Sequence, residues 1–453
     1  MPTAEPSPKA ASLVGQEYEV EVGPVAHGGH CVARTAEGRV LFVRHTLPGE
    51  RVVVRVTEGR EDSRYLRADA VRVLTPAKDR VPAPCPFSGP GRCGGCDWQH
   101  VKPGAQRRLK GEVLAEHLRS LAGLTAEEAG WDGTVEPAPG DKVPAGEVPA
   151  WRTRVQFAVD EQGRAGLRRH RSHEVEPVDR CLIAAEGVEE LGVERRAWPG
   201  IESVEVAAAT GSNDRLVVLT PRPGARLPLV ELDRPVSVMR AEPSRSRGGE
   251  PPLHRVHGRA FVRERADGRT WRVGGGGFWQ GHREAAGVLV DAVMRGLTPR
   301  KGEMAIDLYC GAGLFAGALA DRVGERGAVL GIEASKRAVE DARHNLADFP
   351  RVRVEHGPVA KVLPRTGIAS ADLVVLDPPR AGAGGEVVRR VAGLGARRVA
   401  YVACDPAALA RDLAHFRAAG YVPRFLRAFD LFPMTHHLEC VAILEPGRKG
   451  AQD

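Results

Sequence analysis

Apolar and polar residues alternate over residues 12 to 74, and glycine or proline separates the alternating runs. An alternation of period two is typical of strands with one buried face, and glycine and proline mark the turns between them. The pattern predicts a small five-stranded barrel. Arginines recur along these runs, and Phe42 and Tyr65 could offer aromatic faces to the bases of a nucleic acid. A solvated, arginine-rich face on a β module is the alternative interpretation.

The pattern changes after the barrel. Apolar residues at helix spacing predict a helix over about 105 to 121. The run from 131 to 150 is rich in proline and glycine, which is typical of a surface loop or linker. Strand-like alternation resumes at Trp151, so roughly 125 to 260 should form an antiparallel α+β middle region. Residues 241 to 253 are predicted to form a disordered loop within it.

From about Phe278 onward, candidate strands alternate with candidate helices, which favours a doubly wound parallel sheet. A helix is predicted over 287 to 297, and a last strand in HLECVAILE. The predicted fold class is α/β, with a Rossmann-like C-terminal domain, a small N-terminal β-barrel that resembles OB folds, and an α+β middle region. The predicted boundaries are 12–74 for the barrel, 75–265 for the middle region and 266–447 for the C-terminal domain.

Composition narrows the class of protein. The 453 residues are 42% hydrophobic and 27% charged, and they contain no apolar run long enough to cross a membrane. The opening MPTAEPSPKA lacks the apolar core of an export signal, so we expect a cytoplasmic protein with no membrane partner. The eight cysteines are too sparse for a disulfide framework and should be thiols or metal ligands. A net charge of +7 favours a polyanionic partner without identifying it.

A glycine-rich loop follows a candidate strand in AIDLYCGAGLFAG. Small residues there let backbone amides and a helix N-terminus approach a ligand closely. Glu333 ends the next strand, 26 residues after Asp307, where a carboxylate can accept hydrogen bonds from both hydroxyls of a ribose. The loop lacks the Gly-Lys-Ser/Thr of ATP sites and the complete G-x-G-x-x-G of dinucleotide sites. This combination favours S-adenosylmethionine over ATP or NAD.

Further polar groups are predicted at the same edge of the sheet. The DPPR sequence at 377 to 380 follows the buried strand LVVL, and Cys404 follows the strand VAYVA. Open α/β sheets bind ligands at the carboxyl ends of their strands. Glu439 begins the last predicted strand and could reach this edge. Most lone cysteines near strand ends are small core residues, and a plain strand-to-turn junction would also explain DPPR, so these positions alone leave the chemistry open.

The motifs FWQGH, DLYCGAG, GIE, DPPRAG, YVACDPAALARD and FPMTHHLE occur along the chain in that order. In this combination the sequence resembles the RNA (uracil-5-)-methyltransferase family, in the branch with an N-terminal TRAM domain. The resemblance implies S-adenosylmethionine contacts at Gln280, Tyr309, Glu333 and Asp377. It also implies that Cys404 is the nucleophile and Glu439 the base.

Methylation at carbon 5 of uracil explains why a cysteine and a carboxylate would occur together. Carbon 5 is too weakly nucleophilic to attack a sulfonium methyl group unaided, so a thiolate must first add at carbon 6 and generate an enolate. The enolate carbon takes the methyl group, and the carboxylate then removes the carbon-5 proton so that the cysteine can leave. Cys310 and Cys440 are rival thiols, but one lies inside the glycine loop and the other follows Glu439 on its strand, so Cys404 is preferred.

Two positions depart from the family pattern. Asp405 stands where the family usually has asparagine after the nucleophile, which changes the local hydrogen bonding. Leu314 stands where a polar residue is common just past the glycine loop, so no cofactor contact is carried over there.

Cys85, Cys93 and Cys96 form a C-x7-C-x2-C set, and the glycines between the last two free the backbone to wrap around a metal centre. The resemblance supplies Cys181 as the fourth ligand and implies a 4Fe-4S cluster on the four thiolates. A four-cysteine zinc site and four unliganded thiols are the alternatives. The cluster would be structural or would orient the RNA, because methyl transfer needs no electron.

The RNA itself is not identified by the sequence. Ribosomal RNA of the 23S class is preferred, because the cluster-bearing branch acts largely on it, and transfer RNA is the alternative; a monomer is expected. The target uridine should be flipped out of its stack to reach Cys404. Methylation of an amino group on a base competes, because DPPR resembles the Asp/Asn-Pro-Pro-aromatic loops of such enzymes, but Arg380 replaces the aromatic residue. A non-catalytic RNA-binding protein with a vestigial fold is the last alternative, and the intact catalytic set argues against it.

Overall fold

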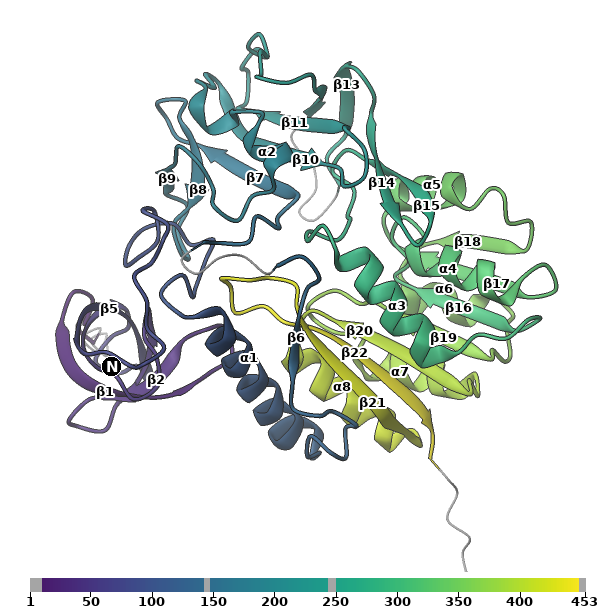
Figure 1. The fold of residues 1–453 in the computed structure, drawn as a ribbon, viewed down its shortest axis with the longest axis horizontal. Helices are drawn as coiled ribbons and strands as arrows, with labels where there is room; N and C mark the ends of the chain where they lie inside the picture. The colour runs from purple at the N-terminus through teal and green to yellow at the C-terminus, as the bar shows by residue number, and fades with distance from the viewer. Residues whose placement is uncertain (1–9, 142–146, 243–249, 448–453) are drawn as a thin grey trace, which may run out of the picture.

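The computed structural model describes residues 10–141, 147–242 and 250–447. The N-terminal segment forms a closed barrel in the order β1-β2-β3-β5-β4 (Figure 1, purple). Its strands are β1 (Glu17–Val25), β2 (Cys31–Arg34), β3 (Val40–Arg44), β4 (Arg51–Glu58) and β5 (Tyr65–Thr75). Alternate valines and leucines fill the interior, with Leu41 and Leu66 fully buried. The prediction of a five-stranded barrel is confirmed.

A seven-stranded sheet forms the middle region, in the order β13-β12-β11-β10-β7-β8-β9 (Figure 1, teal). Its elements are β7 (Arg154–Val159), β8 (Ala165–Arg168), β9 (Val175–Pro177), the short helix α2 (Glu186–Glu189), a 3-10 turn (Val193–Arg195), β10 (Ile201–Ala208), β11 (Arg215–Pro221), β12 (Ser237–Ala241) and β13 (Leu253–His257). The sequence predicted an antiparallel middle region. This prediction is wrong for one pair of strands, because β11 and β12 run parallel. Of the loop predicted over 241 to 253, residues 243–249 lie outside the described residues.

The C-terminal region is an eight-stranded sheet in the order β18-β17-β16-β19-β20-β22-β21-β6, with helices packed on it. Its strands are β16 (Met304–Leu308), β17 (Ala328–Glu333), β18 (Val352–His356), β19 (Leu373–Leu376), β20 (Arg398–Ala403), β21 (Tyr421–Asp430) and β22 (Glu439–Pro446), joined by β6 (Val135–Pro137). Its helical elements are α3 (Ala285–Leu297), α4 (Leu314–Val323), α5 (Lys336–Asn345), α6 (Val359–Val362), a 3-10 turn (Leu363–Arg365), α7 (Gly384–Gly393) and α8 (Pro406–Ala418). The chain reverses the direction of strand order between β16 and β19, which is the position where such sheets bind ligands.

The last strand, β22, inserts between β20 and β21 and runs antiparallel to both. An antiparallel neighbour places its first residue beside the last residue of the strand it pairs with. Ala403 at the end of β20 therefore faces Cys440 near the start of β22. This register brings the beginning of β22 to the carboxyl ends of the parallel strands.

Two segments that the sequence analysis placed in the middle region pack against the C-terminal sheet instead. The predicted helix is α1 (Pro103–His117), which continues through a π-helical turn (Leu118–Ala122) and packs on α8. The sequence predicted a surface loop or linker over 131 to 150. The run also contains β6, which pairs with β21 at the edge of the sheet. Trp131 and Val135 are buried in the same hydrophobic cluster as β20 and β22. Burial of these apolar side chains therefore holds the segment against the sheet, although the surrounding prolines and glycines are typical of a loop.

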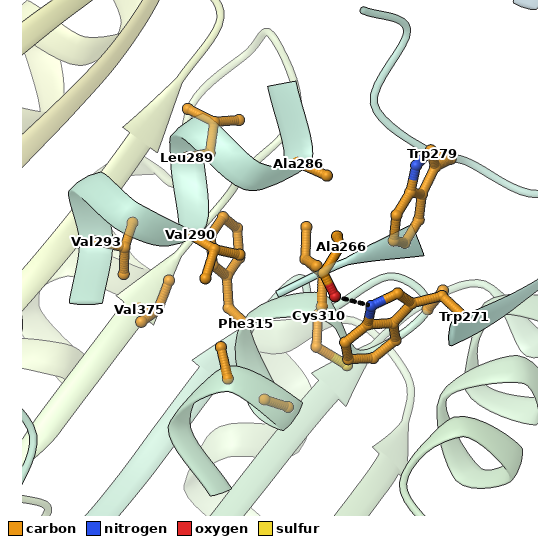
Figure 2. Packing of buried hydrophobic residues seen from close by; sticks show 14 of the residues in the cluster. Ala266, Trp271, Trp279, Ala286, Leu289, Val290, Val293, Cys310, Phe315 and Val375 are labelled. Carbon is orange, nitrogen blue, oxygen red and sulfur yellow. Dashed lines mark hydrogen bonds between the residues drawn. The ribbon is translucent and has the colours of Figure 1, made fainter. Parts of the chain in front are cut away.

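A hairpin of β14 (Phe261–Ala266) and β15 (Arg269–Gly274) joins the middle sheet to the C-terminal region, and the boundary predicted at 266 falls inside it. Figure 2 shows Trp271 of this hairpin beside Trp279 and Cys310, with its indole N–H donating to the Ala266 carbonyl at 3.1 Å. A Cβ on Gly317 of α4 would lie 2.5 Å from the Trp271 ring, so the glycine admits the indole. The hairpin is thus packed directly behind the glycine-rich loop. In the described part of the chain, no helix combines the length and apolarity needed to cross a membrane.

Candidate active site

Cys404 and Glu439 meet at the carboxyl edge of the sheet. Cys404 directly follows β20, and Glu439 is the first residue of β22, one position before the paired Cys440. Burial, and then the nearby carboxylates of Glu439 and Asp377, raise the pKa of the Cys404 thiol to about 12. The rival thiols Cys310 and Cys440 are buried in hydrophobic clusters, whereas Cys404 lines a pocket.

Asp377 is the neighbour shared by this pair and by the predicted cofactor edge. Burial, and then the Glu333 carboxylate, raise the pKa of Asp377 to about 7. Burial and Asp377 also raise the pKa of Glu439 well above its usual value. Like charges that crowd together out of water favour protonated carboxyls. These carboxyls therefore form one buried cluster that a cationic ligand would stabilise.

The glycine-rich loop is held against the end of β17. The Glu333 carboxylate accepts hydrogen bonds from the backbone N–H of Gly311 at 3.0 Å and of Ser335 at 2.7 Å. Tyr309 adopts a left-handed backbone with φ of 64°, an uncommon conformation for a residue other than glycine that often marks functional sites. Gly313 has φ of 95°, and a Cβ there would lie 2.9 Å from Leu346. The sequence places glycine where the loop must pass this close to α5.

Asp307, at the carboxyl end of β16, is a functional candidate that sequence reasoning described but did not select. It is fully buried, and in the described residues neither of its oxygens has a side-chain hydrogen-bond partner. Burial, with Asp377 and Glu333 nearby, raises its pKa well above the usual value. The signal in the sequence was an acid that ends a wholly apolar strand.

The structure does not join every predicted residue to this edge. Asp377, Glu333, Cys404 and Glu439 come together, and Tyr309 lies in the loop between β16 and α4. Gln280 lies in the segment between the hairpin and α3 with its side chain buried. Hydrogen bonds among the described residues do not link Gln280 to the carboxylates. Its role remains a prediction.

Asp412 of α8 positions the loop after DPPR, and sequence reasoning missed it. Its carboxylate accepts hydrogen bonds from the backbone N–H groups of Ala383 at 2.7 Å and Gly384 at 3.1 Å. The Tyr401 hydroxyl donates to the same carboxylate at 2.5 Å. The only signal was the final acid of YVACDPAALARD, which is spaced to face the loop from the helix.

The pocket at Cys404 is small, about 90 Å³, and part of its wall comes from the barrel. It is lined by Cys404, Asp405, Arg380 and His437 from the C-terminal region and by His27 and Gly29 from the β1–β2 loop. Burial, with His436 and Arg380 nearby, lowers the pKa of His437 to about 3. Neutral His437 accepts a hydrogen bond from Arg380 at 3.3 Å, which holds the guanidinium near the thiol.

The 431–438 turn before β22 is fixed from two sides. Lys110 of α1 is completely buried and donates to the Asp430 carboxylate and to the Phe432 carbonyl. On the other side, the His436 ring and backbone N–H both bond the Asp97 carboxylate, at 2.6 and 3.2 Å. Asp97 directly follows the cysteine-rich segment, so that segment contacts the 431–438 turn.

The four predicted metal-ligating cysteines line one cavity: Cys85, Cys93, Cys96 and Cys181. Burial raises the pKa of Cys181 to about 11 and also raises the pKa of Cys93 and Cys96. The backbone passes within 2.8 Å of where a Cβ on Gly94 would lie, so glycine allows this close approach to His170. Over the described ranges, no group of three or more His, Cys, Asp or Glu side chains is placed to hold a single metal ion.

Another cavity, of about 580 Å³, separates the barrel from the β8–β9 turn. We call it the barrel groove; its basic and aromatic lining includes His30, Phe42, Arg44, Arg67, Arg169 and Arg171. The Arg67 guanidinium lies 5.9 Å from the centre of the Phe42 ring and 5.6 Å from that of Tyr65. The two aromatic residues named from the sequence are thus gathered around one arginine at this groove.

Comparison with known proteins matches both ends of the chain to family models. Residues 11–71 match the TRAM domain, and residues 368–446 match tRNA (uracil-5-)-methyltransferases. An uncharacterized RNA methyltransferase of Streptomyces coelicolor is 75% identical over 99% of this chain and 96% of its own length. An uncharacterized RNA methyltransferase of Bifidobacterium longum is 34% identical over 94% of this chain and 96% of its own length.

A solved structure matches the whole architecture. The tRNA (uracil-54, C5)-methyltransferase of Pyrococcus abyssi, in complex with S-adenosyl-L-homocysteine, aligns with a TM-score of 0.68. The alignment covers 94% of this chain and all of that one, at 22% sequence identity. At this identity the likeness shows the fold, and it confirms the predicted fold class.

Proposed function

Since the chain belongs to a family of RNA methyltransferases and carries a TRAM domain, we propose that it methylates carbon 5 of a uridine in RNA with S-adenosylmethionine as the methyl donor. The observation that carries this proposal is the meeting of Cys404 and Glu439 at the acidic edge of the sheet. A thiol and a carboxyl at one site match the two roles, nucleophile and base, that carbon-5 methylation requires.

The residues at this edge fit S-adenosylmethionine. Asp307, Glu333 and Asp377 form a cluster of crowded carboxyls, and Asp307 keeps both oxygens without a side-chain partner in the described residues. The sulfonium and ammonium charges of the donor would offset the burial and the repulsion that raise the pKa values of Asp307 and Asp377. Glu333, already oriented by two backbone N–H groups, would accept from the ribose hydroxyls, and Tyr309 and Gln280 would complete the site. When bound, the donor supplies an electrophilic methyl group.

Cys404 would act first on the RNA. Its thiolate adds to carbon 6 of the flipped uracil, which leaves an enolate whose carbon 5 takes the methyl group. Burial and three nearby carboxylates disfavour the thiolate, and the Arg380 cation near the pocket opposes them by favouring ionisation. Glu439 then removes the carbon-5 proton, and the electrons of that bond re-form the carbon 5–carbon 6 double bond as the Cys404 sulfur leaves.

The RNA would extend from the catalytic pocket to the barrel groove. Arginines at the groove can neutralise phosphates, and Phe42 and Tyr65 can stack on unpaired bases. Ribosomal RNA is the proposed class, with transfer RNA as the alternative. Liquid chromatography and mass spectrometry of 5-methyluridine, mapped in both RNA classes from cells with and without the gene, decides between them.

A 4Fe-4S cluster held by Cys85, Cys93, Cys96 and Cys181 is the proposed occupant of the cysteine cavity. A zinc ion would draw four sulfurs to about 2.3 Å from one point. The four thiols share a cavity, and four cysteine thiolates are the usual ligand set of a 4Fe-4S cluster, with zinc as the alternative. Anaerobically purified protein should contain iron and acid-labile sulfide, and zinc without either would refute the cluster.

Covalent trapping tests the proposed reaction. With S-adenosylmethionine and RNA that contains 5-fluorouridine, carbon 5 carries no removable proton, so the cysteine adduct should persist on a denaturing gel. Wild-type protein and Cys440→Ala, a control for the buried neighbouring thiol, should both form the adduct. Cys404→Ala should form none. Equal yields from wild type and Cys404→Ala would overturn the nucleophile, and methylation of a base amino group would give no adduct with any variant.

A further inference from the structure

The loop of residues 26–30, which joins β1 to β2, packs closely against the 431–438 turn. Gly28 and Gly29 turn its tip with φ of 88° and 79°. Gly29 is buried, and a Cβ there would lie 2.8 Å from the Cβ of His436. Its carbonyl accepts a hydrogen bond from the Trp98 indole at 3.1 Å. The barrel is therefore seated against the active site by a specific contact.

His27, at the tip of this loop, reaches the residue that follows the nucleophile. Its Nε2 lies 3.4 Å from one carboxylate oxygen of Asp405. The other oxygen of Asp405 accepts the backbone N–H of Ala408 at 2.7 Å and so caps the N-terminus of α8. The cap fixes the carboxylate in place directly beside Cys404.

The charges around these two groups come from several elements. Cys404 faces the carboxylates of Glu439, Asp377 and Asp405 and a single nearby cation, Arg380, among the groups that shift its pKa in the described residues. His27 faces Asp405 and the ring of His117, and the centres of the two histidine rings are 5.3 Å apart. Burial, and then His27 and the Arg411 cation, lower the pKa of His117. A carboxylate beside a thiol opposes its ionisation, and a cation or N–H donor on that carboxylate offsets the effect.

We propose that His27 is a positioning residue that holds Asp405 and offsets its charge, so that the RNA-binding barrel completes the environment in which Cys404 ionises. His27 takes no proton from Cys404 and forms no bond to the uracil. The inference rests on the proposed function for the use of the thiolate. The reactivity of Cys404 can nevertheless be measured with no RNA and no S-adenosylmethionine present.

A double-mutant cycle in the full-length protein tests this. Wild type, His27→Ala, Asp405→Asn and the double variant are treated with iodoacetamide across about pH 6 to 10, where the thiolate displaces iodide. Mass spectrometry follows alkylation of the peptide that contains Cys404, and melting temperatures check the fold. Asparagine still caps a helix, so Asp405→Asn removes the charge and keeps the cap. His254→Ala is the matched control, because His254 is an exposed histidine 3.0 Å from Glu242 on the middle sheet.

His27→Ala should slow alkylation near neutral pH by at least about threefold while Asp405 is present, and shift the pH profile upward. In the Asp405→Asn background the same change should have no effect. His27→Lys, which places an ammonium group beside Asp405, should restore the rate, and His254→Ala should match wild type. Equal slowing in both backgrounds, which would mean that His27 acts on Cys404 independently of Asp405, overturns the proposal, as does an unchanged rate when His27→Ala is made with Asp405 present. Failure of RNA trapping with an intact alkylation cycle would instead refute the proposed function alone.

Discussion

The catalytic edge and the barrel groove handle charge in opposite ways. At the edge, Asp307, Asp377 and Glu439 are withdrawn from water and close together, and their pKa values are raised. In the barrel groove, the side chains of Arg67 and Arg171 are 22% and 51% exposed and lie 3.5 and 3.7 Å from Glu58. A buried ionisable group has a perturbed pKa, so a bound ligand can change its protonation and it can take part in proton transfer. An exposed charged group instead attracts a charged partner, and salt weakens that attraction.

This contrast gives separate expectations for the two regions. Substitutions at the edge should lower kcat or donor binding and depend on pH. Substitutions at the groove should raise the KM for RNA, leave kcat near wild type and depend on salt. A substitution at the edge that changes only the KM for RNA, or one at the groove that lowers only kcat, would contradict this contrast.

The largest effect should come from Asp377→Asn. Asp377 is the neighbour common to Glu333, Cys404 and Glu439, so on the proposed function its loss removes a contact to the methyl donor and changes the electrostatics of Cys404 and Glu439. We expect kcat/KM for methyl transfer to fall about 100-fold, measured with labelled S-adenosylmethionine. Asp372→Asn is the control, because Asp372 is exposed at the opposite end of β19 and should change the rate little. Similar losses in both variants would indicate damage to the strand.

A smaller effect is expected at the barrel groove. Phe42→Ala removes one stacking face and should raise the KM for RNA about tenfold with kcat unchanged. Arg67→Ala should also reduce the salt dependence of RNA binding, seen as a slope smaller by about one in a plot of log affinity against log salt. Arg51→Ala, an exposed arginine of the same barrel outside the groove lining, is the control. A fall in kcat with unchanged KM would contradict the role of the groove.

The smallest effect concerns stability. The pKa of Asp377 is 3.8 as the reference value and about 7 in the folded protein. A raised carboxyl pKa means that the folded state holds a proton which the unfolded chain has released, so this residue lowers stability as pH rises from about 4 to about 7. The melting temperature of Asp377→Asn relative to wild type should therefore rise across that window. A constant difference would show that Asp377 does not titrate there.

Much of the architecture follows from local patterns, and the exceptions have physical causes. The barrel and the βα units of the C-terminal sheet have strong periodicity, and the sequence predicts both. β6 escapes prediction because it has three residues in a proline-rich run, and its pairing with β21 depends on contacts nearly 300 residues away. The parallel pairing of β11 with β12 likewise depends on tertiary contacts, because the alternation within a strand does not specify the direction of its neighbour.

The candidate site divides along the same line. Motif order predicts Cys404, Glu333 and Asp377 as site residues, but the approach of Glu439 to Cys404 depends on the antiparallel insertion of β22, which its sequence does not specify. Asp412 could have been selected from its spacing within YVACDPAALARD. His27 carries no sequence signal, because a histidine in a turn is common and only the seating of the barrel brings it to Asp405.

The most direct test of the central claim uses Glu439→Gln with ordinary RNA and S-adenosylmethionine. If Cys404 is the nucleophile and Glu439 the base, the variant should add to uracil and transfer the methyl group but fail to release it. A covalent protein–RNA complex that contains the transferred methyl group should accumulate on a denaturing gel, and it should vanish when Cys404→Ala is combined with Glu439→Gln. Normal turnover by Glu439→Gln, or a complex that persists without Cys404, would contradict the account.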